Sequence, residues 1–502
     1  KVFAPPPRQT AGMSDMMRKR KTPGVLRRAR CVAVYERKRR MRQEHLGVNS
    51  ILEGPILHQL LMLFWPILLG TFFQQLYNTA DAIIVGQYVG AAGLAAVGGS
   101  TGTIISLVVN LLVGVGVGTS VAVAQSYGAR RFEDVSRAVH TSVALSIVGG
   151  AFFMVLGVLA APQVLVWMDT PSDVMPHAMG YIRIYFFGTI PSFFYNVAAG
   201  VLRAVGDTKR PLYFLMVSCG VNIVLDIVFV GWFQMGAAGA AIGTIISQCI
   251  SALLAGYVLL CDEQPYKLNW KKLRFHGDAL WDVLRVGLPT GMGNNMFTLS
   301  NLILQASINS FGTVVVAACA AYGKIEGFHW MILDSIGMAL TTFSGQNFGA
   351  QKMERVRQSV RIGLAMAAGA SLFVSVMMCL FNQPLLRMFT QDAEVLELGK
   401  GLIYRVVPFY ITYIGLEIFN TVVRGCGDAL FPVLLMLSGI CALRIAWVIW
   451  VLPLSRSVYT LMWSYPVSWI LTSAMFLIYY LHGGWLRRCQ AKLKQKLTKA
   501  DA

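Results

Sequence analysis

Long apolar runs separated by short polar segments dominate the sequence from residue 56 onward. A helix needs about 20 mostly apolar residues to cross a bilayer, and twelve runs meet this length. They lie at about residues 57–80, 97–124, 139–161, 178–201, 211–232, 237–260, 284–308, 314–343, 359–381, 400–422, 432–453 and 459–482. Only 13% of the residues are charged, against roughly 25% in soluble domains. The sequence therefore excludes an ordinary soluble enzyme and predicts an all-α polytopic membrane protein.

The net charge of +19 is distributed unevenly along the chain. Residues 1–50 carry 14 Lys and Arg against 3 acids, without an apolar run long enough for a signal peptide. We expect a disordered basic tail, although these residues could also precede the true start of translation. Elsewhere the basic residues favour the loops after even-numbered runs and the C-terminal tail. Because cytoplasmic loops are rich in Lys and Arg, both termini are predicted to be cytoplasmic.

An internal repeat relates the two halves of the sequence. Residues 125–139 (QSYGARRFEDVSRAV) and 346–360 (QNFGAQKMERVRQSV) share Gln, Gly, Ala, Glu and two Val at an offset of 221 residues. Residues 203–211 and 424–432 share Arg, Gly, Asp and Pro at the same offset. Each half contains six runs, an even number, so both halves enter the membrane in the same direction. This parallel repeat, with a pseudo-twofold axis along the membrane normal, is a transporter architecture in which access alternates.

The runs and the repeat together divide the chain into five segments. They are a basic tail at 1–50, an N-lobe of six helices at 51–262, a cytoplasmic inter-lobe loop at 263–283, a C-lobe of six helices at 284–482 and a basic cytoplasmic tail at 483–502. The glycine-rich run 114–118 favours close helix packing over phosphate binding. In the second repeated motif, Gly206 and Gly427 are expected to permit a tight turn. Arg203 and Arg424 are interpreted as hinge and topology residues rather than as substrate ligands.

These motifs resemble those of the MATE (multidrug and toxic compound extrusion) family. The similarity spans about residues 55–485 and rests on Pro66 and Asp81 of the first run, the QxxGA loops, and the loops RAVGDTKRP and RGCGDALFP. It continues in the residues NIVLD of the fifth run, which end at Asp226, and in Gly243-Thr244 of the sixth. The resemblance implies twelve helices in two six-helix lobes that open to one side as a V. It also implies efflux of organic, often cationic compounds, driven by inward movement of H⁺ or Na⁺.

Ionisable residues inside a membrane are costly and indicate functional sites. In the first half they are Asp81 and Asp226, and Asn222 shares a helix face with Asp226 because the two are four residues apart. A carboxylate in a low-dielectric interior keeps a proton to higher pH than in water, and carboxylate, amide and hydroxyl oxygens also bind Na⁺. In the family resembled, residues at the positions of Asp81, Asn222, Asp226 and Thr244 form the cation-coupling site. The alternatives are a hydrated helix-end residue for Asp81 and a structural hydrogen bond to Asn222 for Asp226.

The repeat provides an internal comparison for this site. At the offset of 221, the residues Asn222, Asp226 and Thr244 correspond to Leu443, Trp447 and Tyr465. The coupling chemistry is therefore expected in the first lobe alone. Further polar residues within the runs are candidates for a secondary role, and they are Asn196, Lys324, Glu326, Asp334 and Glu417. A second-lobe cation site is disfavoured because the seventh run contains no acid, and for Lys324 we expect a structural ion pair.

Side chains on the wall between the lobes are expected to contact substrate, because Met and aromatic groups tolerate varied apolar cations. The candidates are Gln74, Tyr77, Asn78, Met292 and Asn295, with Phe72, Phe73 and Met296 beside them. At helical spacing, such residues more often belong to ordinary helix packing.

The sequence thus predicts a secondary active multidrug efflux antiporter that exports organic, cationic compounds in exchange for H⁺ or Na⁺. We expect a bacterial plasma-membrane protein that is monomeric, contacts the lipid bilayer, binds no nucleic acid, has no cofactor besides the coupling ion and is not an enzyme. The alternative is a flippase for lipids or lipid-linked oligosaccharides from the same superfamily, which predicts a large basic cavity. An intramembrane enzyme is disfavoured, because the sequence has no HExxH motif.

Overall fold

The structure, a computed structural model, describes residues 48–501. The basic tail predicted at residues 1–50 therefore lies outside the described residues except for its last three positions. Contacts divide the chain into the units Lys1–Ser50 and Ile51–Ala502. All helices from α3 onward belong to the second unit.

Helices form almost all of the described chain, and residues 48–501 contain no strand. The helices of the first half are α2 (Val48–Glu53), α3 (Ile56–Tyr88), α4 (Ala91–Gly98), α5 (Ser100–Gly128), α6 (Phe132–Trp167), α7 (Met175–Phe187), α8 (Thr189–Ala204), α9 (Lys209–Asp226), the π-helix η1 (Ile227–Trp232) and α10 (Gly236–Cys261). The short 3₁₀ helix η2 (Trp270–Lys272) lies in the connection to the second half.

The second half repeats this pattern with more breaks. Its helices are α11 (Gly277–Asn309), α12 (Thr313–Gly349), α13 (Met353–Leu380), α14 (Asn382–Arg387), α15 (Ala393–Val406), η3 (Val407–Phe409), α16 (Tyr410–Gly425), α17 (Leu430–Met436), η4 (Leu437–Ala442), α18 (Leu443–Ala446), η5 (Trp447–Val451), η6 (Leu452–Leu454), α19 (Val458–Met462), α20 (Ser464–His482) and α21 (Trp485–Asp501).

Nine helical segments of the described chain are long and apolar enough to cross a membrane, or ten if α7 and α8, bent by 49°, form one span. The helices α11 and α12 complete the twelve predicted spans. They are 33 and 37 residues long, but polar residues such as Asn294 and Asp334 lower their hydropathy. Each predicted run coincides with one of these segments, so the predicted all-α polytopic fold is confirmed.

The inter-lobe connection is shorter than the predicted loop at 263–283. α11 begins at Gly277, so residues 277–283 form its first two turns. Hydropathy did not indicate these turns because they carry Asp278 and Asp282 and precede the apolar run. An acidic residue in the first turn, here Asp278, stabilises a helix N-terminus. The helix therefore extends beyond its apolar part.

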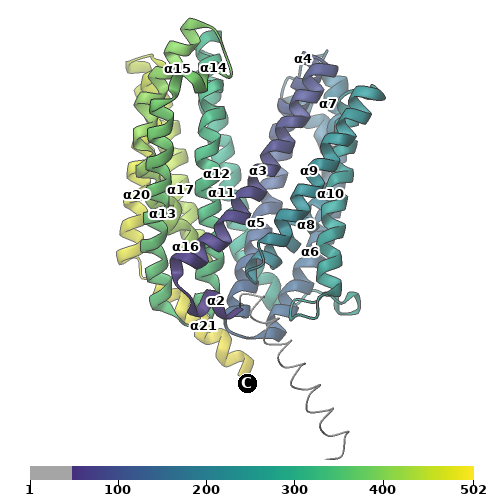
Figure 1. The fold of residues 1–502 in the computed structure, drawn as a ribbon, viewed down its shortest axis with the longest axis vertical. Helices are drawn as coiled ribbons and strands as arrows, with labels where there is room; N and C mark the ends of the chain where they lie inside the picture. Colours follow the sequence, from purple (N-terminus) through teal and green to yellow (C-terminus); the bar gives the residue numbers. More distant parts are fainter. Residues whose placement is uncertain (1–47, 502) are drawn as a thin grey trace, which may run out of the picture. The chain divides into compact units, whose positions relative to one another are not determined.

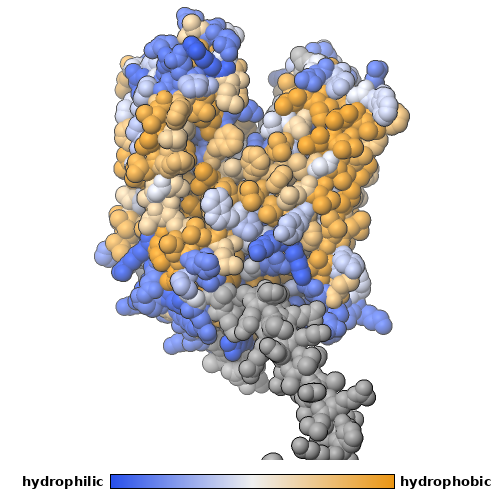
Figure 2. Space-filling model, viewed as in Figure 1, coloured by the Kyte–Doolittle hydropathy of each residue, from blue (hydrophilic) through white to orange (hydrophobic). Residues whose placement is uncertain are grey.

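Within the second unit, the helices form two bundles. α4 to α10 lie on one side and α11 to α20 on the other, with the bundles apart at one end and together at the other (Figure 1). α3 crosses between them, and its N-terminal half packs into the core of the second bundle. Figure 2 shows a broad apolar band across the visible face of both bundles, with hydrophilic residues at the two ends of this band. This distribution is the one expected of helices embedded in lipid.

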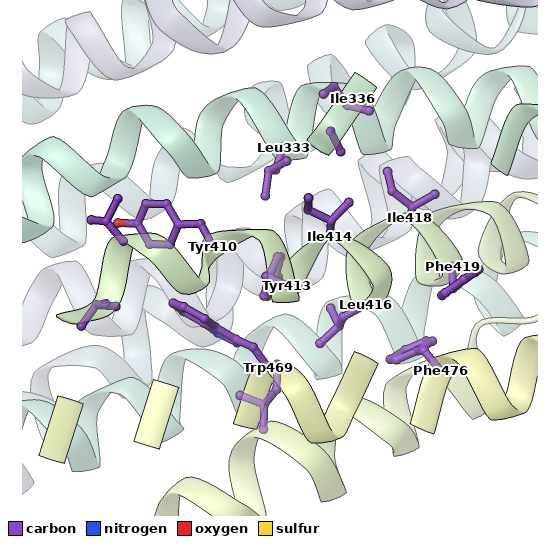
Figure 3. Packing of buried hydrophobic residues seen from close by; sticks show 14 of the residues in the cluster. Leu333, Ile336, Tyr410, Tyr413, Ile414, Leu416, Ile418, Phe419, Trp469 and Phe476 are labelled. Atoms are coloured by element: carbon purple, nitrogen blue, oxygen red, sulfur yellow. The ribbon is translucent and has the colours of Figure 1, made fainter. Parts of the chain in front are cut away.

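The second bundle is organised around α16. Figure 3 shows α16 between α12, which contributes Leu333 and Ile336, and α20, which contributes Trp469 and Phe476. Leu416 of α16 is completely buried in this core. The packing holds α12 and α16 side by side, and these two helices carry Asp334 and Glu417.

Glycines allow the two bundles to meet along α5 and α11. Gly114 and Gly118 of α5 face Gly287 and Gly291 of α11. A Cβ atom added at Gly114 would lie 2.5 Å from the backbone nitrogen of Gly291, and one added at Gly287 would lie 2.8 Å from the Cα atom of Val115. Small residues four apart let membrane helices approach backbone to backbone. The structure thus confirms the packing role predicted for the run 114–118.

Candidate functional site

The four first-lobe residues predicted to couple cation movement come together in one buried cluster. They are Asp81 of α3, Asn222 and Asp226 of α9, and Thr244 of α10. Asn222 and Asp226 are 0% exposed. Thr244 Oγ1 donates a hydrogen bond to Asp81 Oδ2 at 3.3 Å. Asp81 also lies within interaction range of Asp226 and Asn222, so three helices converge on one pair of carboxylates.

The backbone around Asp226 is adapted to this convergence. α9 ends at Asp226 and continues directly as the π-helix η1, and π-helical turns often occur at functional sites. Gly243 of α10 faces the carboxylate, since a Cβ atom there would lie 2.5 Å from Asp226 Oδ1. The absence of a side chain at residue 243 therefore lets α10 approach Asp226.

Most polar atoms of the cluster have no hydrogen-bond partner within the described chain. They are Oδ1 of Asp81, both carboxylate oxygens of Asp226, and the side-chain oxygen and nitrogen of Asn222. Buried polar groups nearly always have a partner, and two adjacent buried carboxylates repel each other when both are charged. A proton on one carboxylate, or a Na⁺ ion bound by the oxygens, would satisfy the cluster. The arrangement is therefore chemically suited to exchange a small cation.

A cavity of about 530 Å³ lies beside this cluster and takes its lining from both halves of the chain. Gln74 and Tyr77 line it as predicted for substrate contacts, together with Phe73 and Asn196. Tyr77 precedes Asp81 by one turn of α3, and its hydroxyl is within electrostatic range of the Asp81 carboxylate. The volume is in the range that holds drug-sized ligands. The cavity and the carboxylate cluster therefore share helix α3.

Five of the eight predicted substrate contacts lie away from the cavity lining of the described chain, and they are Phe72, Asn78, Met292, Asn295 and Met296. Asn78 follows Tyr77 and is rotated by about 100° from it around the helix axis. Met292 is 50% exposed. The side-chain nitrogen of Asn295 donates a hydrogen bond to the carbonyl of Leu107 at 2.9 Å, so this residue belongs to the contact between α11 and α5.

Charged side chains of the second half also face the cavity. Asp334 of α12 and Glu417 and Arg424 of α16 all line it. The charge of Arg424 acts on both carboxylates, although no ion pair within 4.0 Å joins any of the three in residues 48–501. Three of the predicted secondary residues, Asn196, Asp334 and Glu417, thus belong to the cavity rather than to the first-lobe cluster.

Lys324 and Glu326 lie elsewhere on α12. Lys324 is exposed and pairs with no acid of the described chain, so the expected ion pair is not formed. Glu326 follows Lys324 by only two residues and therefore lies on a different face of α12. There it interacts with Tyr322 and Trp330. Asp334 follows Lys324 by ten residues, so the two lie about 15 Å apart along the axis of α12. Neither acid is therefore placed to meet the Lys324 ammonium group.

Arg203 and Arg424, which were expected to be hinge and topology residues, also line the cavity. Each lies in the last turn of its helix, α8 or α16. The predicted tight turns follow at Gly206 and Gly427, with φ of 94° and 92°.

The two QxxGA motifs join the lobes next to these arginines. Gln125 Nε2 donates a hydrogen bond to the Gly425 carbonyl at 2.9 Å, and Gln346 Nε2 donates one to the Ala204 carbonyl at 2.6 Å. Ala204 and Gly425 directly follow Arg203 and Arg424 in the sequence. The lobes are therefore connected at the end of the cavity where the two arginines lie.

Comparison with known proteins agrees with this geometry. A family model described as MatE matches residues 66–228 and 289–450, one segment in each half of the chain. The chain belongs to the MatE family. Membership confirms the resemblance to MATE transporters and identifies this MatE protein as a multi-span helical membrane protein of a multidrug transporter family.

Two relatives from Bacillus subtilis are similar to this MatE protein over most of their lengths. The probable multidrug resistance protein YoeA is 25% identical over 410 residues, which cover 80% of this chain and 88% of YoeA. The probable multidrug resistance protein YpnP is 28% identical over 395 residues, which cover 78% of this chain and 87% of YpnP.

Solved structures of other transporters share the fold of this MatE protein. A MOP superfamily transporter from Pyrococcus furiosus Vc1, described as having a binding pocket of reverse polarity, superposes with a TM-score of 0.82 at 23% identity. The match covers 89% of this chain and 98% of that chain. An outward-facing multidrug resistance MATE transporter gives a TM-score of 0.81 at 22% identity, covering 89% and 98%. These similarities support the two-lobed arrangement of twelve helices.

The spacing of Arg203 and Arg424 from earlier polar residues in the sequence indicates that both arginines face the cavity. Arg203 follows Asn196 by seven residues, and Arg424 follows Glu417 by seven. Seven residues are about two helical turns, so both members of each pair share a face. A polar residue two turns before each arginine indicates a polar face that continues into the membrane.

Proposed function

We propose that this protein is a secondary active antiporter that exports organic, cationic, drug-like compounds in exchange for H⁺ or Na⁺. The buried cluster of Asp81, Asn222, Asp226 and Thr244 carries the proposal, because most of its polar atoms lack a partner in the described chain. The names of the relatives, probable multidrug resistance proteins, support the class of substrate. The proposed location is a bacterial cell membrane, with a monomer whose two termini are cytoplasmic.

In the proposed mechanism, the cluster and the cavity are coupled through α3. A cation that reaches Asp81 and Asp226 from outside compensates their charge and relieves the repulsion between them. The change at Asp81 reaches Tyr77, which lies one turn away in the wall of the cavity. The substrate then leaves outward, and the lobes rearrange. Release of the cation inward restores the charged pair and the substrate-accepting state.

The membrane potential can drive this exchange. One elementary charge that moves inward down a potential of 100 mV releases about 2.3 kcal/mol. Transport of the substrate requires no chemical conversion, so the roles assigned to these side chains are binding, orientation and charge compensation.

The alternative lipid flippase requires a basic cavity for anionic headgroups. Arg203 and Arg424 line the cavity, but Asp334 and Glu417 do so as well, so the formal charges of these four residues cancel. The charge balance supports drug efflux over transport of a strongly anionic lipid.

Uptake of ethidium into everted vesicles, in which the cytoplasmic face is outside, tests the proposal under an imposed proton or sodium gradient. Asp226→Asn and Asp81→Asn should reduce gradient-driven transport at least about tenfold, since each removes a carboxylate that the coupling cation requires. Asp173→Asn changes an exposed carboxylate in the connection between α6 and α7 and serves as the matched control. Undiminished gradient-driven transport in both cluster variants would refute the coupling role.

A further inference from the structure

The inter-lobe connection covers one position of the first half of the chain. It crosses from α10 to α6 through two hydrogen bonds. The Leu268 amide donates to the Leu259 carbonyl of α10 at 2.7 Å. The Asn269 amide donates to Nε2 of His140 in α6 at 3.0 Å. As a result, His140 is only 2% exposed and Leu259 is completely buried.

The equivalent position of the second half is not covered by the described chain. At the offset of 221, His140 corresponds to Arg361 of α13 and Leu259 to Tyr480 of α20. Arg361 is exposed and Tyr480 is half-buried, and neither side chain forms a hydrogen bond or ion pair within residues 48–501. α13 and α20 lie on the side of the second bundle that faces away from the first (Figure 1). This position is therefore accessible to a molecule from the membrane.

Three hydrogen-bond donors converge at this position. Arg357 precedes Arg361 by four residues, so the two arginines share a face of α13. The Tyr480 hydroxyl lies within electrostatic range of both guanidinium groups. The ring of Tyr480 packs against those of Phe419 and Trp485, with centroids 4.8 and 5.4 Å away. Two guanidinium groups and a phenol hydroxyl are the kind of donors that a phosphate group accepts.

The two arginines are only partly compensated by an acid. Glu354 lies 4.0 Å from Arg357, and the two side chains are 68% and 62% exposed. An exposed pair of this kind contributes little free energy. Arg361 has no acidic partner within the described chain. With all three groups ionised, the position keeps one net positive charge and favours an anion.

An exposed apolar face of α13 continues from Arg361 into the span. Ala365, Gly369, Leu372 and Val376 follow at intervals of three or four residues, and all four are exposed. A Cβ atom at Gly369 would meet no atom within 4 Å. Leu372 lies about 16 Å from Arg361 along the helix axis, which is about half the thickness of the hydrocarbon core. The face therefore has the length of one lipid leaflet.

We propose that one anionic phospholipid binds here, with its phosphate on Arg357, Arg361 and Tyr480 and an acyl chain along the exposed face of α13. A lipid fits better than a soluble phosphate ester, because the charged end of this face leads directly into its apolar part. The inference is independent of the proposed export function, since none of these residues lines the cavity or belongs to the coupling cluster.

Native mass spectrometry of the purified full-length protein tests the proposal, because it resolves the first lipid that binds. Dioleoyl phosphatidylglycerol and dioleoyl phosphatidylcholine have the same chains but differ in net charge. The Kd of the wild-type protein should be about tenfold lower for phosphatidylglycerol, the size of one charged hydrogen bond. Glycerophosphoglycerol is the same headgroup without chains. It should bind at least about a hundredfold more weakly than the lipid, because each buried CH₂ group contributes about 0.8 kcal/mol.

Variants assign the preference to this position. Arg357→Gln/Arg361→Gln should bind the two lipids equally, and Tyr480→Phe should weaken phosphatidylglycerol binding about threefold or more, as the loss of one hydrogen bond predicts. The control Arg183→Gln/Arg387→Gln removes the same charge from exposed positions of α7 and α14, at the end where the bundles are apart (Figure 1). It should keep the wild-type preference.

The inference is overturned if the wild-type protein binds the two lipids equally or if the Arg357→Gln/Arg361→Gln variant keeps the preference. Loss of the preference in the control as well would show that only the total charge matters, which also overturns it. Equal affinities for glycerophosphoglycerol and phosphatidylglycerol would identify a site for a soluble phosphate ester and would overturn the assignment to a lipid.

Discussion

Gln125 and Gln346 occupy equivalent positions of the internal repeat, and each donates a hydrogen bond to a backbone carbonyl of the opposite lobe. The glycines of the same motifs are also reciprocal, since a Cβ atom at Gly128 would overlap the Gln346 carbonyl and one at Gly349 would overlap the Gln125 carbonyl. The duplicated motif thus forms the same contact twice around one pseudo-twofold axis. An opening of the lobes at this end must break both contacts.

Removal of the two glutamine side chains should therefore favour opening of the lobes at this end. Each hydrogen bond contributes about 0.5–1.5 kcal/mol, so the double variant Gln125→Ala/Gln346→Ala should increase the open population several-fold. Spin labels at Trp167 and Met388, which are both more than 70% exposed, measure the distance between the lobes at the end opposite to the glutamines. The labels are attached in a variant whose native cysteines have been replaced. Gln305→Ala removes an exposed glutamine of α11 and is the control. Identical distance distributions in all three proteins would contradict the role of the glutamines.

The glycine contact between α5 and α11 should tolerate no side chain. In Gly118→Ala the new methyl group would overlap the Val283 carbonyl and lie 2.7 Å from the Gly287 nitrogen, so the helices must separate. Overpacking of this kind costs about 1–3 kcal/mol, and thermal unfolding of the purified protein should shift to lower temperature. Gly220→Ala of α9 meets no atom within 4 Å and should leave the transition unchanged or raise it. Equal transitions for the two variants would show that the contact is not close.

Gly243→Ala should disturb coupling without removing a charged group. The added methyl group lies 2.5 Å from Asp226 Oδ1, so the carboxylate or α10 must move away from Asp81. We expect the dependence of ethidium efflux on the ion gradient to fall while ethidium binding to the purified protein stays within about twofold. Gly180→Ala of α7, where a methyl group meets no atom within 4 Å, is the matched control. Wild-type coupling in Gly243→Ala would contradict the geometry derived for the cluster.

Arg444 should stabilise the second lobe without taking part in coupling. It is 1% exposed, donates hydrogen bonds to Ser468 at 3.1 Å and Asn301 at 3.3 Å, and lies 4.2 Å from the ring of Tyr465. Arg444→Leu removes the hydrogen bonds to the Ser468 hydroxyl and to the half-buried Asn301, so a total loss of about 1–3 kcal/mol is expected in unfolding experiments.

Gradient-driven efflux by the folded Arg444→Leu protein should persist, because the coupling cluster lies in the other lobe. Arg183→Leu at an exposed position should change stability by no more than about 0.5 kcal/mol. Loss of coupling in a stable Arg444→Leu variant would contradict the assignment to the first lobe.

The sequence was most informative where one strong pattern determined the structure. The twelve apolar runs and the offset of 221 predicted the helices and the parallel repeat. The spacing of Asn222 and Asp226, together with the family resemblance, predicted the residues that cluster around Asp81. These features are local or recur at fixed intervals, so they do not depend on how distant helices pack.

Features that depend on packing between helices were predicted less well. The cavity-facing positions of Arg203 and Arg424 were missed because helix ends are usually at the membrane interface. Asn295 was assigned to the substrate wall, but it lies in the seam between α5 and α11 and donates to the Leu107 carbonyl there. Which face of a helix meets the other lobe is determined by glycines such as Gly287, and apolar periodicity alone does not show it.

The central claim is that substrate and a small cation exchange at a site built on Asp81 and Asp226. Addition of ethidium to purified protein in weakly buffered solution tests it directly, with a pH-sensitive dye to detect released protons and bound ²²Na⁺ to detect displaced sodium. We predict release of one of the two ions by wild-type protein and by the Asp173→Asn control, and no release by Asp226→Asn. Release that is unchanged in Asp226→Asn and Asp81→Asn, or the absence of any ion release from a wild-type protein that binds ethidium, would contradict the account.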